Sequence, residues 1–260
     1  MGGFAQRQAY PPGRADTKLI DGGISMELNG VTIPEAIMQR VIERRGTEHS
    51  FADLDPLHTA LVVIDLQHAF MNYAVGFAAV PAARDIVPAV NRLAAAVLET
   101  GGGVFWIKMT HDERCFSEWS VAYELLAPDV RAKRIAALSE GTLGHELRPD
   151  LDVRPEDEMI KKYRYSAFMP GTSDLPDRLR SRGFDTLLIT GTVTNVCCES
   201  SARDANMTNF RTIMVSDGNA ALSQAEHDAS LTAFYNTFGD VMDTDMIVAR
   251  LRRPRSARAA

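Results

Sequence analysis

The chain has 260 residues, and its 28 Lys and Arg against 34 Asp and Glu give a net charge of −6. This charge provides no overall attraction to nucleic acid or to an anionic membrane. Hydrophobic residues make up 45% and charged residues 24% of the chain, as in ordinary globular proteins, which excludes a disordered or fibrous chain.

Cysteine usage and the first residues indicate a compartment. The chain has 3 cysteines, and two of them, Cys197 and Cys198, are adjacent, so they do not make a disulfide framework. A reducing environment, the cytoplasm, is therefore the expected location. Residues 1–15 lack the apolar core of a signal peptide, and no apolar run approaches the length that crosses a membrane. We expect neither secretion nor membrane insertion.

The first part of the chain predicts an extension, a strand and a helix. Residues 1–57 show no strong period apart from one short helix near 34–44, so we expect an N-terminal extension that packs on the domain. The run from Ala60 to Asp65 is apolar and β-branched, which is typical of a strand buried on both faces of a parallel sheet. Apolar residues at helical spacing over 86–98 predict a helix that ends at the glycines 101–103.

The middle of the chain alternates strand patterns with an insertion. Residues 104–108 predict a second strand, and residues 109–157 hold two helical patterns among irregular stretches. An insertion of this length is a candidate lid or wall of a substrate pocket. A short strand at 158–162, which we expect to be central in the sheet, is followed by a loop and by a helix whose predicted N-cap is Ser173.

The last third of the chain repeats this alternation. A buried strand is predicted at 186–190 and is broken by Gly191. A helix follows at about 195–207. Another strand and another helix are predicted at 211–216 and 225–238.

The order of these elements predicts one α/β domain. It indicates a doubly wound, mainly parallel six-stranded sheet with helices on both faces, a Rossmann-like three-layer fold. No linker rich in Gly, Ser or Pro divides the chain, so we expect a single domain over residues 58–249. The five arginines of residues 250–260 predict a basic, frayed tail.

Three polar residues stand at the carboxyl ends of predicted strands, where open α/β sheets bind their ligands. Asp65 closes the first strand, Lys162 closes the short strand, and Cys197 lies in the first turn of the helix after Gly191. A helix N-terminus lowers a thiol pKa and stabilises a thiolate nucleophile. Its neighbour Cys198 is an equal candidate by position, because spacing alone does not say which cysteine faces the strand ends.

Each candidate also has a structural explanation. Free cysteines are often buried as small hydrophobic residues, and Asp65 could cap a helix or pair with an arginine. In a functional site, a partly desolvated carboxylate beside a thiol acts as its general base and returns the proton to a leaving amine. A lysine beside both groups keeps the carboxylate ionised and favours the thiolate. Lys108 and Lys161 fit this role as well as Lys162 does.

Three motifs follow these positions. They read Asp-Leu-Gln-His-Ala-Phe at 65–70, Lys-Tyr-Arg-Tyr-Ser-Ala-Phe at 162–168 and Gly-Thr-Val-Thr-Asn-Val-Cys at 191–197. Together, and in this order, they resemble the isochorismatase-like cysteine hydrolase family over about residues 58–240. That family includes N-carbamoylsarcosine and ureidoacrylate amidohydrolases, biuret hydrolase, maleamate amidase and nicotinamidases. Each motif alone is weak, but the combination is specific.

The resemblance implies a catalytic triad with Asp65 as base and acid, Lys162 as electrostatic partner and Cys197 as nucleophile. It also implies a cis peptide bond at Thr192–Val193, which aims the backbone N–H groups of Val193 and Cys197 into an oxyanion hole. The thiolate would attack an amide or ureido carbonyl, and water would hydrolyse the resulting thioester. The expected activity is hydrolysis of a carbon–nitrogen bond, other than a peptide bond, in a small-molecule substrate.

No metal or other cofactor is expected. Nicotinamidases of this family hold a metal with an aspartate and paired histidines after the second strand, where this chain has Met109-Thr110-His111-Asp112. A lone histidine is more often a surface residue than a ligand, which ranks nicotinamide low as a substrate. Isochorismatase itself lacks the cysteine and cleaves a vinyl ether, so the cysteine argues against that activity.

Four side chains beside the motifs are candidate substrate contacts. Gln67, Phe70, Tyr163 and Phe168 could each face the pocket, or else pack in the core or lie on the surface. A glutamine pairs with both the carbonyl and the N–H of a urea-like group. This favours a ureido or N-carbamoyl substrate similar to ureidoacrylate over a simple amide such as maleamate. A catalytically silent binding or scaffold protein is the alternative of another class, and the resemblance and the apolar insertion favour a homodimer or homotetramer.

Overall fold

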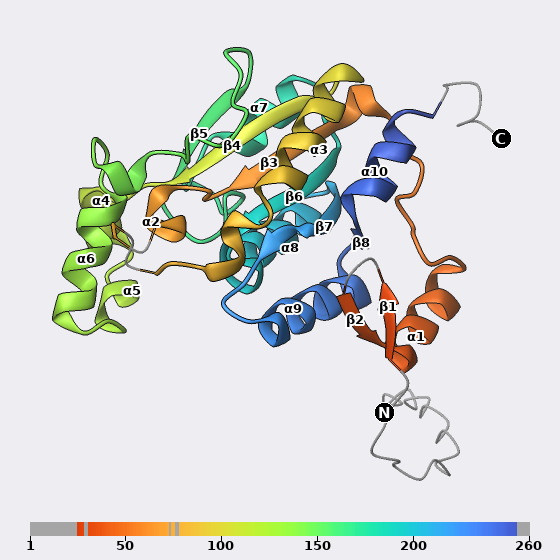
Figure 1. Ribbon diagram of the computed structural model, residues 1–260, viewed down its shortest axis with the longest axis horizontal. Coiled ribbons are helices and arrows are strands. Elements are labelled where there is room, and N and C mark those ends of the chain that lie inside the picture. Colours follow the sequence, from red (N-terminus) through yellow and green to blue (C-terminus); the bar gives the residue numbers. More distant parts are fainter. Residues whose placement is uncertain (1–24, 29–30, 73, 76–77, 254–260) are drawn as a thin grey trace, which may run out of the picture.

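The computed structural model describes residues 25–28, 31–72, 74–75 and 78–253. Its centre is a sheet of six parallel strands in the order β5-β4-β3-β6-β7-β8 (Figure 1). The predicted doubly wound α/β fold is therefore confirmed. The strands are β3 (Thr59–Ile64), β4 (Gly103–Met109), β5 (Glu158–Lys162), β6 (Thr186–Thr192), β7 (Arg211–Ala220) and β8 (Asp240–Met242).

Helices cover both faces of the sheet, because successive side chains of a buried strand point to opposite sides. In β3, Leu61 and Val63 belong to one apolar core, and Val62 and Ile64 belong to the other. The first core contains α3 (Val87–Glu99) and α10 (Thr244–Leu251), and the second contains α7 (Leu175–Ser181), α8 (Glu199–Met207) and α9 (Gln224–Thr237). The molecule thus has three layers.

The direction of the chain through the sheet changes between β3 and β6. β3 is followed by β4 and β5 on one side, and β6 is followed by β7 and β8 on the other. Loops that leave two neighbouring strands in opposite directions open a crevice at the strands' carboxyl ends. Asp65 follows β3, and the π-helix η4 (Thr194–Cys198) follows β6. Both therefore lie at this switch point.

The insertion between β4 and β5, residues 109–157, is called the lid segment below. It folds as short helices, and Figure 1 shows α4 to α6, in green, beside α2 at one end of the sheet. This segment covers the end at which β3 and β4 finish. Its helices and the neighbouring turn are α4 (Glu113–Glu118), α5 (Val121–Glu124), α6 (Pro128–Leu138), η3 (Leu143–His145) and α2 (His68–Met71).

The segment before β3 packs on the side of the domain that carries α9. β1 (Ser25–Leu28) and β2 (Val31–Pro34) form an antiparallel hairpin that leads into α1 (Glu35–Arg45), and both β2 and α1 contact α9 (Figure 1). Arg45 forms an ion pair of 2.8 Å with Asp240 at the start of β8. The helix expected near 34–44 is present, and the short hairpin was not predicted. The 3-10 turns η1 (Pro56–His58) and η2 (Pro81–Arg84) complete the elements.

The position predicted for β5 was wrong. This strand lies at the edge of the sheet and not at its centre, because β6 returns beside β3 instead of continuing beyond β5. Its burial alternates, with Met159 and Lys161 exposed and Ile160 and Lys162 buried. The polar side chains of β5 are tolerated because an edge strand is covered less completely than a central one.

Two smaller predictions also differ from the structure. Asp174 holds the N-cap position of α7, and Ser173 contributes one residue earlier by accepting the Leu175 N–H at 3.2 Å. The tail predicted from Arg250 overlaps α10, where Leu251 is buried in the core; residues 254–260 lie outside the described part. In the described ranges, no helix is long and apolar enough to span a bilayer.

Candidate active site

Asp65, Lys162 and Cys197 come together at the switch point. The Lys162 Nζ lies 2.7 Å from Asp65 Oδ2, and both side chains are 0% exposed. The Cys197 thiol interacts with both groups and is also buried. Three segments that are far apart in the sequence therefore build one enclosed cluster of a carboxylate, an ammonium group and a thiol.

Asp65 leaves β3 in an uncommon backbone conformation. Its φ is 55°, a left-handed value that costs energy in a residue with a Cβ and occurs often at functional sites. Its N–H donates to the Ile107 carbonyl at 2.9 Å, and its carbonyl accepts the Thr192 hydroxyl at 3.1 Å. Gly191 lets β6 lie this close, because a Cβ there would overlap the Ile64 carbonyl oxygen. The two strands beside β3 thus fix the backbone of Asp65.

The turn after β6 carries the candidate nucleophile. The peptide bond between Thr192 and Val193 is cis, and the next five residues form the π-helix η4. His227 of α9 steadies this turn, since its Nδ1 lies 3.0 Å from Thr194 Oγ1. The backbone N–H groups of Val193 and Cys197, which the sequence suggests for an oxyanion hole, both belong to this turn.

The structure distinguishes the two adjacent cysteines. Cys197 interacts with Asp65 and Lys162 at short range, whereas Cys198 feels only the charges of these groups. The Cys198 Sγ lies 3.9 Å from the Thr190 carbonyl oxygen, and the residue is completely buried in the core beneath α8. The choice that helical spacing left open therefore falls on Cys197.

Burial determines where the protons rest. It raises the pKa of Cys197 to about 12, since the Lys162 ammonium offsets only part of the desolvation. Burial also raises the pKa of Asp65, against the attraction of Lys162. Burial alone would lower the pKa of Lys162, but Asp65 and Cys197 raise it. The thiol thus rests neutral beside the ion pair of Asp65 and Lys162. The sequence predicted that the helix N-terminus lowers the thiol pKa, whereas burial raises it.

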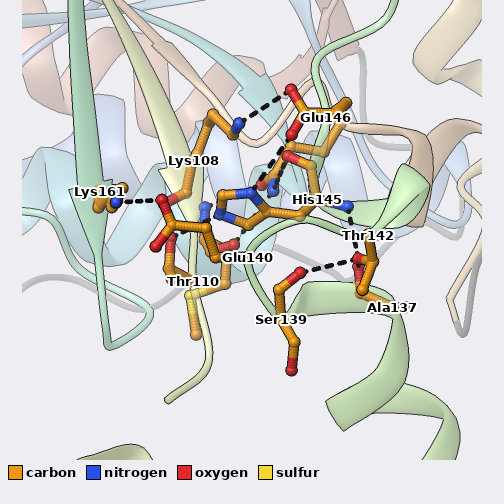
Figure 2. A network of polar contacts seen from close by, with 11 residues as sticks. Lys108, Thr110, Ala137, Ser139, Glu140, Thr142, His145, Glu146 and Lys161 are labelled. Atoms are coloured by element: carbon orange, nitrogen blue, oxygen red, sulfur yellow. Dashed lines mark hydrogen bonds and ion pairs between the residues drawn. The ribbon is translucent and has the colours of Figure 1, made fainter.

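The two other lysines near the strand ends form ion pairs with the lid segment. Lys108 of β4 lies 3.3 Å from Glu146, and Lys161 of β5 pairs with Glu140. Figure 2 shows both lysines with their glutamate partners, on the part of the lid segment that returns toward β5. These lysines therefore anchor the lid segment, and Lys162 alone of the three reaches the carboxyl group of Asp65.

Gln67 is fully buried and binds backbone groups. Its Nε2 donates to the carbonyls of Met109 at 3.1 Å and His145 at 2.9 Å, and its Oε1 accepts the Met109 N–H at 2.8 Å. Both donor hydrogens are used, so the amide has no free N–H for the predicted contact with a urea-like substrate. The Met109 N–H also lies close to Asp65 and acts to lower the pKa of its carboxyl group. Gln67 therefore supports the backbone that holds the carboxyl group.

The three aromatic candidates pack against other side chains. Phe70 and Phe168 belong to the two apolar cores, and Phe168 meets Phe210 edge to face at 5.7 Å between ring centroids. Tyr163 packs on the lid segment beneath the Arg114 guanidinium, 3.9 Å from its ring centre. The structure shows the core packing that the sequence left open for the two phenylalanines, and their contact with a substrate stays a prediction.

His111 is buried and not on the surface, contrary to the expectation. It is 2% exposed, and its Nδ1 lies 2.7 Å from the Tyr123 hydroxyl of the lid segment. Burial, and the charges of Arg134 and Lys162, lower the pKa of His111 to about 3, so the imidazole is neutral. Among the described residues, no three His, Cys, Asp or Glu side chains are grouped as metal ligands. The sequence analysis did not identify Tyr123 or Arg134, because neither residue lies in a recognisable motif.

Comparison with known proteins shows the family to which this chain belongs. Residues 59–246 match the Isochorismatase domain. The uncharacterized isochorismatase family protein YecD of Escherichia coli is 32% identical over 76% of this chain and 99% of its own length. The ureidoacrylate amidohydrolase RutB of Methylobacterium radiotolerans is 29% identical over 79% of this chain and 84% of its own length.

The fold comparison agrees. A crystal structure of a cysteine hydrolase from Pseudomonas syringae pv. phaseolicola superimposes with a TM-score of 0.69 and 29% identity, over 76% of this chain and 94% of that one. This chain belongs to the isochorismatase family. It is a hydrolase, and the buried cysteine, aspartate and lysine lie where the strand order of the family fold reverses.

Proposed function

We propose that the chain is a cysteine-dependent amidohydrolase that cleaves a carbon–nitrogen bond of a small ureido or N-carbamoyl compound through a thioester intermediate. The observation that carries the proposal is the buried ion pair of Asp65 and Lys162, 2.7 Å long, with the Cys197 thiol close enough to interact with both groups. Each of the three has a distinct task. Two charges and a thiol that share an enclosed position cost desolvation, and arrangements of this kind gather at functional sites.

In the first half of the reaction, Asp65 accepts the thiol proton as the Cys197 sulfur attacks the substrate carbonyl carbon. A neutral resting thiol is compatible with this step, because the base already interacts with the thiol and the proton moves as the carbon–sulfur bond forms. Lys162 stabilises the negative charge during the transfer. The N–H groups of Val193 and Cys197 then donate to the carbonyl oxygen of the tetrahedral intermediate.

In the second half, Asp65 gives the proton to the leaving nitrogen, the carbon–nitrogen bond breaks, and a thioester remains on Cys197. Asp65, again ionised, takes a proton from water as the water oxygen attacks the thioester carbon. The carbon–sulfur bond breaks, the proton returns to sulfur, and an acid is released. The same carboxyl group thus acts as base and acid, which suits its raised pKa.

The relatives support the substrate class. Gln67 does not support it, because both N–H groups of its amide donate to backbone carbonyls and its oxygen accepts a backbone N–H. A relative that is 29% identical over 84% of its own length acts on ureidoacrylate. A panel of ureido and N-carbamoyl compounds, with simple amides such as maleamate as the comparison set and ammonia release as the readout, tests this part. Faster turnover of the simple amides would contradict it.

The cysteine pair provides a matched test of the mechanism. Cys197→Ala should lower kcat/KM by roughly 10,000-fold or more, because the nucleophile is lost. Cys198→Ala removes a buried thiol of the same size that does not hydrogen-bond Asp65 or Lys162, and kcat/KM should stay within about tenfold. Intact mass after a rapid acid quench should show the acyl adduct in wild type and in Cys198→Ala. Near-normal turnover by Cys197→Ala would overturn the mechanism.

A further inference from the structure

His111 and Tyr123 form a buried polar pair that the proposed mechanism does not use. The Tyr123 hydroxyl and His111 Nδ1 are 2.7 Å apart, and both side chains are 2% exposed. On the same ring, His111 Nε2 is buried and has no hydrogen-bond partner among the described residues. A buried polar atom without a partner is costly in a folded protein and often indicates a ligand-binding position.

The hydrogen-bond pattern gives this nitrogen a definite role. Burial raises the pKa of Tyr123 well above its ordinary value, so the phenol keeps its proton. The Tyr123 hydroxyl has His111 Nδ1 as its hydrogen-bond partner in the described part of the chain, so its proton is directed to that nitrogen. The imidazole is neutral, and its single hydrogen must then lie on Nε2. His111 therefore offers an N–H donor that the protein leaves unused.

The position and surroundings of His111 identify what this donor binds. Thr110, its neighbour, donates its backbone N–H to the Lys162 carbonyl at 2.9 Å, so His111 stands next to the candidate active site. Lys162 and Arg134 lower its pKa, and Asp112 is the carboxylate that raises it. The potential around the ring is thus positive, which favours an anionic acceptor.

Arg134 extends this positive region into the lid segment. It is 4% exposed, and its guanidinium faces the rings of Trp119, Tyr123 and Tyr165 at 5.5 to 5.6 Å from their centres. A guanidinium held against three aromatic rings is restricted in its conformations. Because this guanidinium is already held in place, little conformational entropy is lost when an anion binds close to it.

We propose that His111 Nε2, in the field of Arg134, forms a subsite for a carboxylate carried by the substrate. This inference rests on the proposed function, and it narrows the substrate class to small ureido or amide compounds that also carry a carboxylate group. The Nε2–H donates to the carboxylate, and Tyr123 keeps the imidazole in the tautomer that can donate. The subsite holds the acid end of the substrate while the carbonyl carbon lies at Cys197.

Binding without turnover tests the subsite. In the Cys197→Ala background, maleate and its neutral diamide, maleamide, are titrated while the imidazole ¹⁵N signals are followed by NMR, with the His111 signals assigned from His111→Gln. Maleate should shift the His111 Nε2–H signal along a saturable curve. Maleamide should bind at least about tenfold more weakly, because a charge-assisted hydrogen bond is lost.

Three variants in the same background distinguish a subsite from a structural role. His111→Ala should remove the preference for maleate over maleamide, and His111→Gln, which keeps an N–H donor, should restore part of it. Tyr123→Phe should weaken maleate binding without abolishing it, because the imidazole can then take the other tautomer. His49→Gln makes the same change at a buried histidine near Asp240, away from the site, and should leave the preference unchanged.

Two outcomes would overturn the subsite. One is the absence of a saturable shift of the His111 signal with maleate. The other is an equal response to maleate and maleamide. Neither outcome bears on the cysteine mechanism, because the measurement needs no turnover, and loss of activity in Cys197→Ala with maleate binding intact separates the two proposals.

Discussion

Lys161 and Lys162 are neighbours on β5, and each pairs with a carboxylate from another part of the chain. Lys161 and Glu140 are 45% and 63% exposed, whereas Lys162 and Asp65 are both 0% exposed. The first pair lies at the surface and helps to anchor the lid segment, as Figure 2 shows. The second lies inside the protein and touches the Cys197 thiol. Water screens the first pair and is excluded from the second.

This difference is the reason that we propose a chemical role for Lys162 and none for Lys161. In the surface pair, each charge is stable alone, so the pairing changes little when one partner is removed. In the buried pair, each charge depends on the other, since an unpaired charge in the interior is strongly unfavourable. The buried pair therefore controls the proton affinity of Asp65, which the proposed reaction requires.

The largest expected effect comes from removing the buried partner. Lys162→Met should lower kcat/KM by roughly 1,000-fold, because Asp65 loses the charge that keeps it ionised. It should also lower the free energy of unfolding at neutral pH by about 3–5 kcal/mol. Lys161→Met is the matched control and should leave both quantities almost unchanged. Activity assays and urea unfolding of the two variants make the comparison, and similar effects from both substitutions would contradict it.

An intermediate effect is expected in the pH profile. Burial raises the pKa of Asp65, and the base is active when ionised, so kcat/KM should fall about tenfold per pH unit below that pKa. The acid limb should therefore lie above the ordinary aspartate pKa of about 4. The contribution of Asp65 to the free energy of unfolding has the opposite pH dependence: it is fully present below the unfolded pKa and is lost as pH rises through the folded pKa.

Kinetics from pH 4 to 8 measure this limb. The profile of Lys161→Met should superimpose on that of wild type, because its charge does not act on Asp65. An acid limb at or below the ordinary aspartate pKa would show that the buried carboxyl group is not the base. A shift of the limb in Lys161→Met would show that the surface pair is coupled to the site.

The smallest effect is expected at Gln67, which acts through Met109. Gln67→Leu removes three hydrogen bonds to backbone groups and should lower kcat by roughly tenfold, with a smaller change in KM. Asn91→Leu is the control, since Asn91 also bridges backbone groups, the Asp150 carbonyl and the Asp152 N–H, at an exposed position. An unchanged kcat in Gln67→Leu would contradict the proposal that Gln67 positions the active site through Met109.

The regular elements of the domain could be predicted because each carries its own pattern. β3 and β6 are continuous apolar runs, and α3 shows helical spacing that ends at glycines. The hairpin before α1 and the three-residue strand β8 are too short for such a pattern. The edge position of β5 depends on where β6 returns, which is a property of the whole sheet.

The candidate site likewise has a part that could be predicted from the sequence and a part that could not. The motifs were sufficient to choose Asp65, Lys162 and Cys197, and the structure places them together. The substrate contacts were not predictable, because the direction of a side chain depends on its neighbours in space. Gln67 turns to backbone groups of β4 and η3, and His111 is enclosed by a lid segment whose packing no motif describes.

By itself, the sequence determined the α/β fold and the residue types at the strand ends, because periodicity and motif spacing are local properties of the chain. The motifs, through the family resemblance, already named Cys197 over its neighbour, and only the tertiary structure shows that its thiol lies in an enclosed position where burial raises its pKa to about 12. It also made Lys162 differ from Lys161. The reason is the same in each case: burial sets the energy of a charge, and burial depends on segments that are distant in the chain.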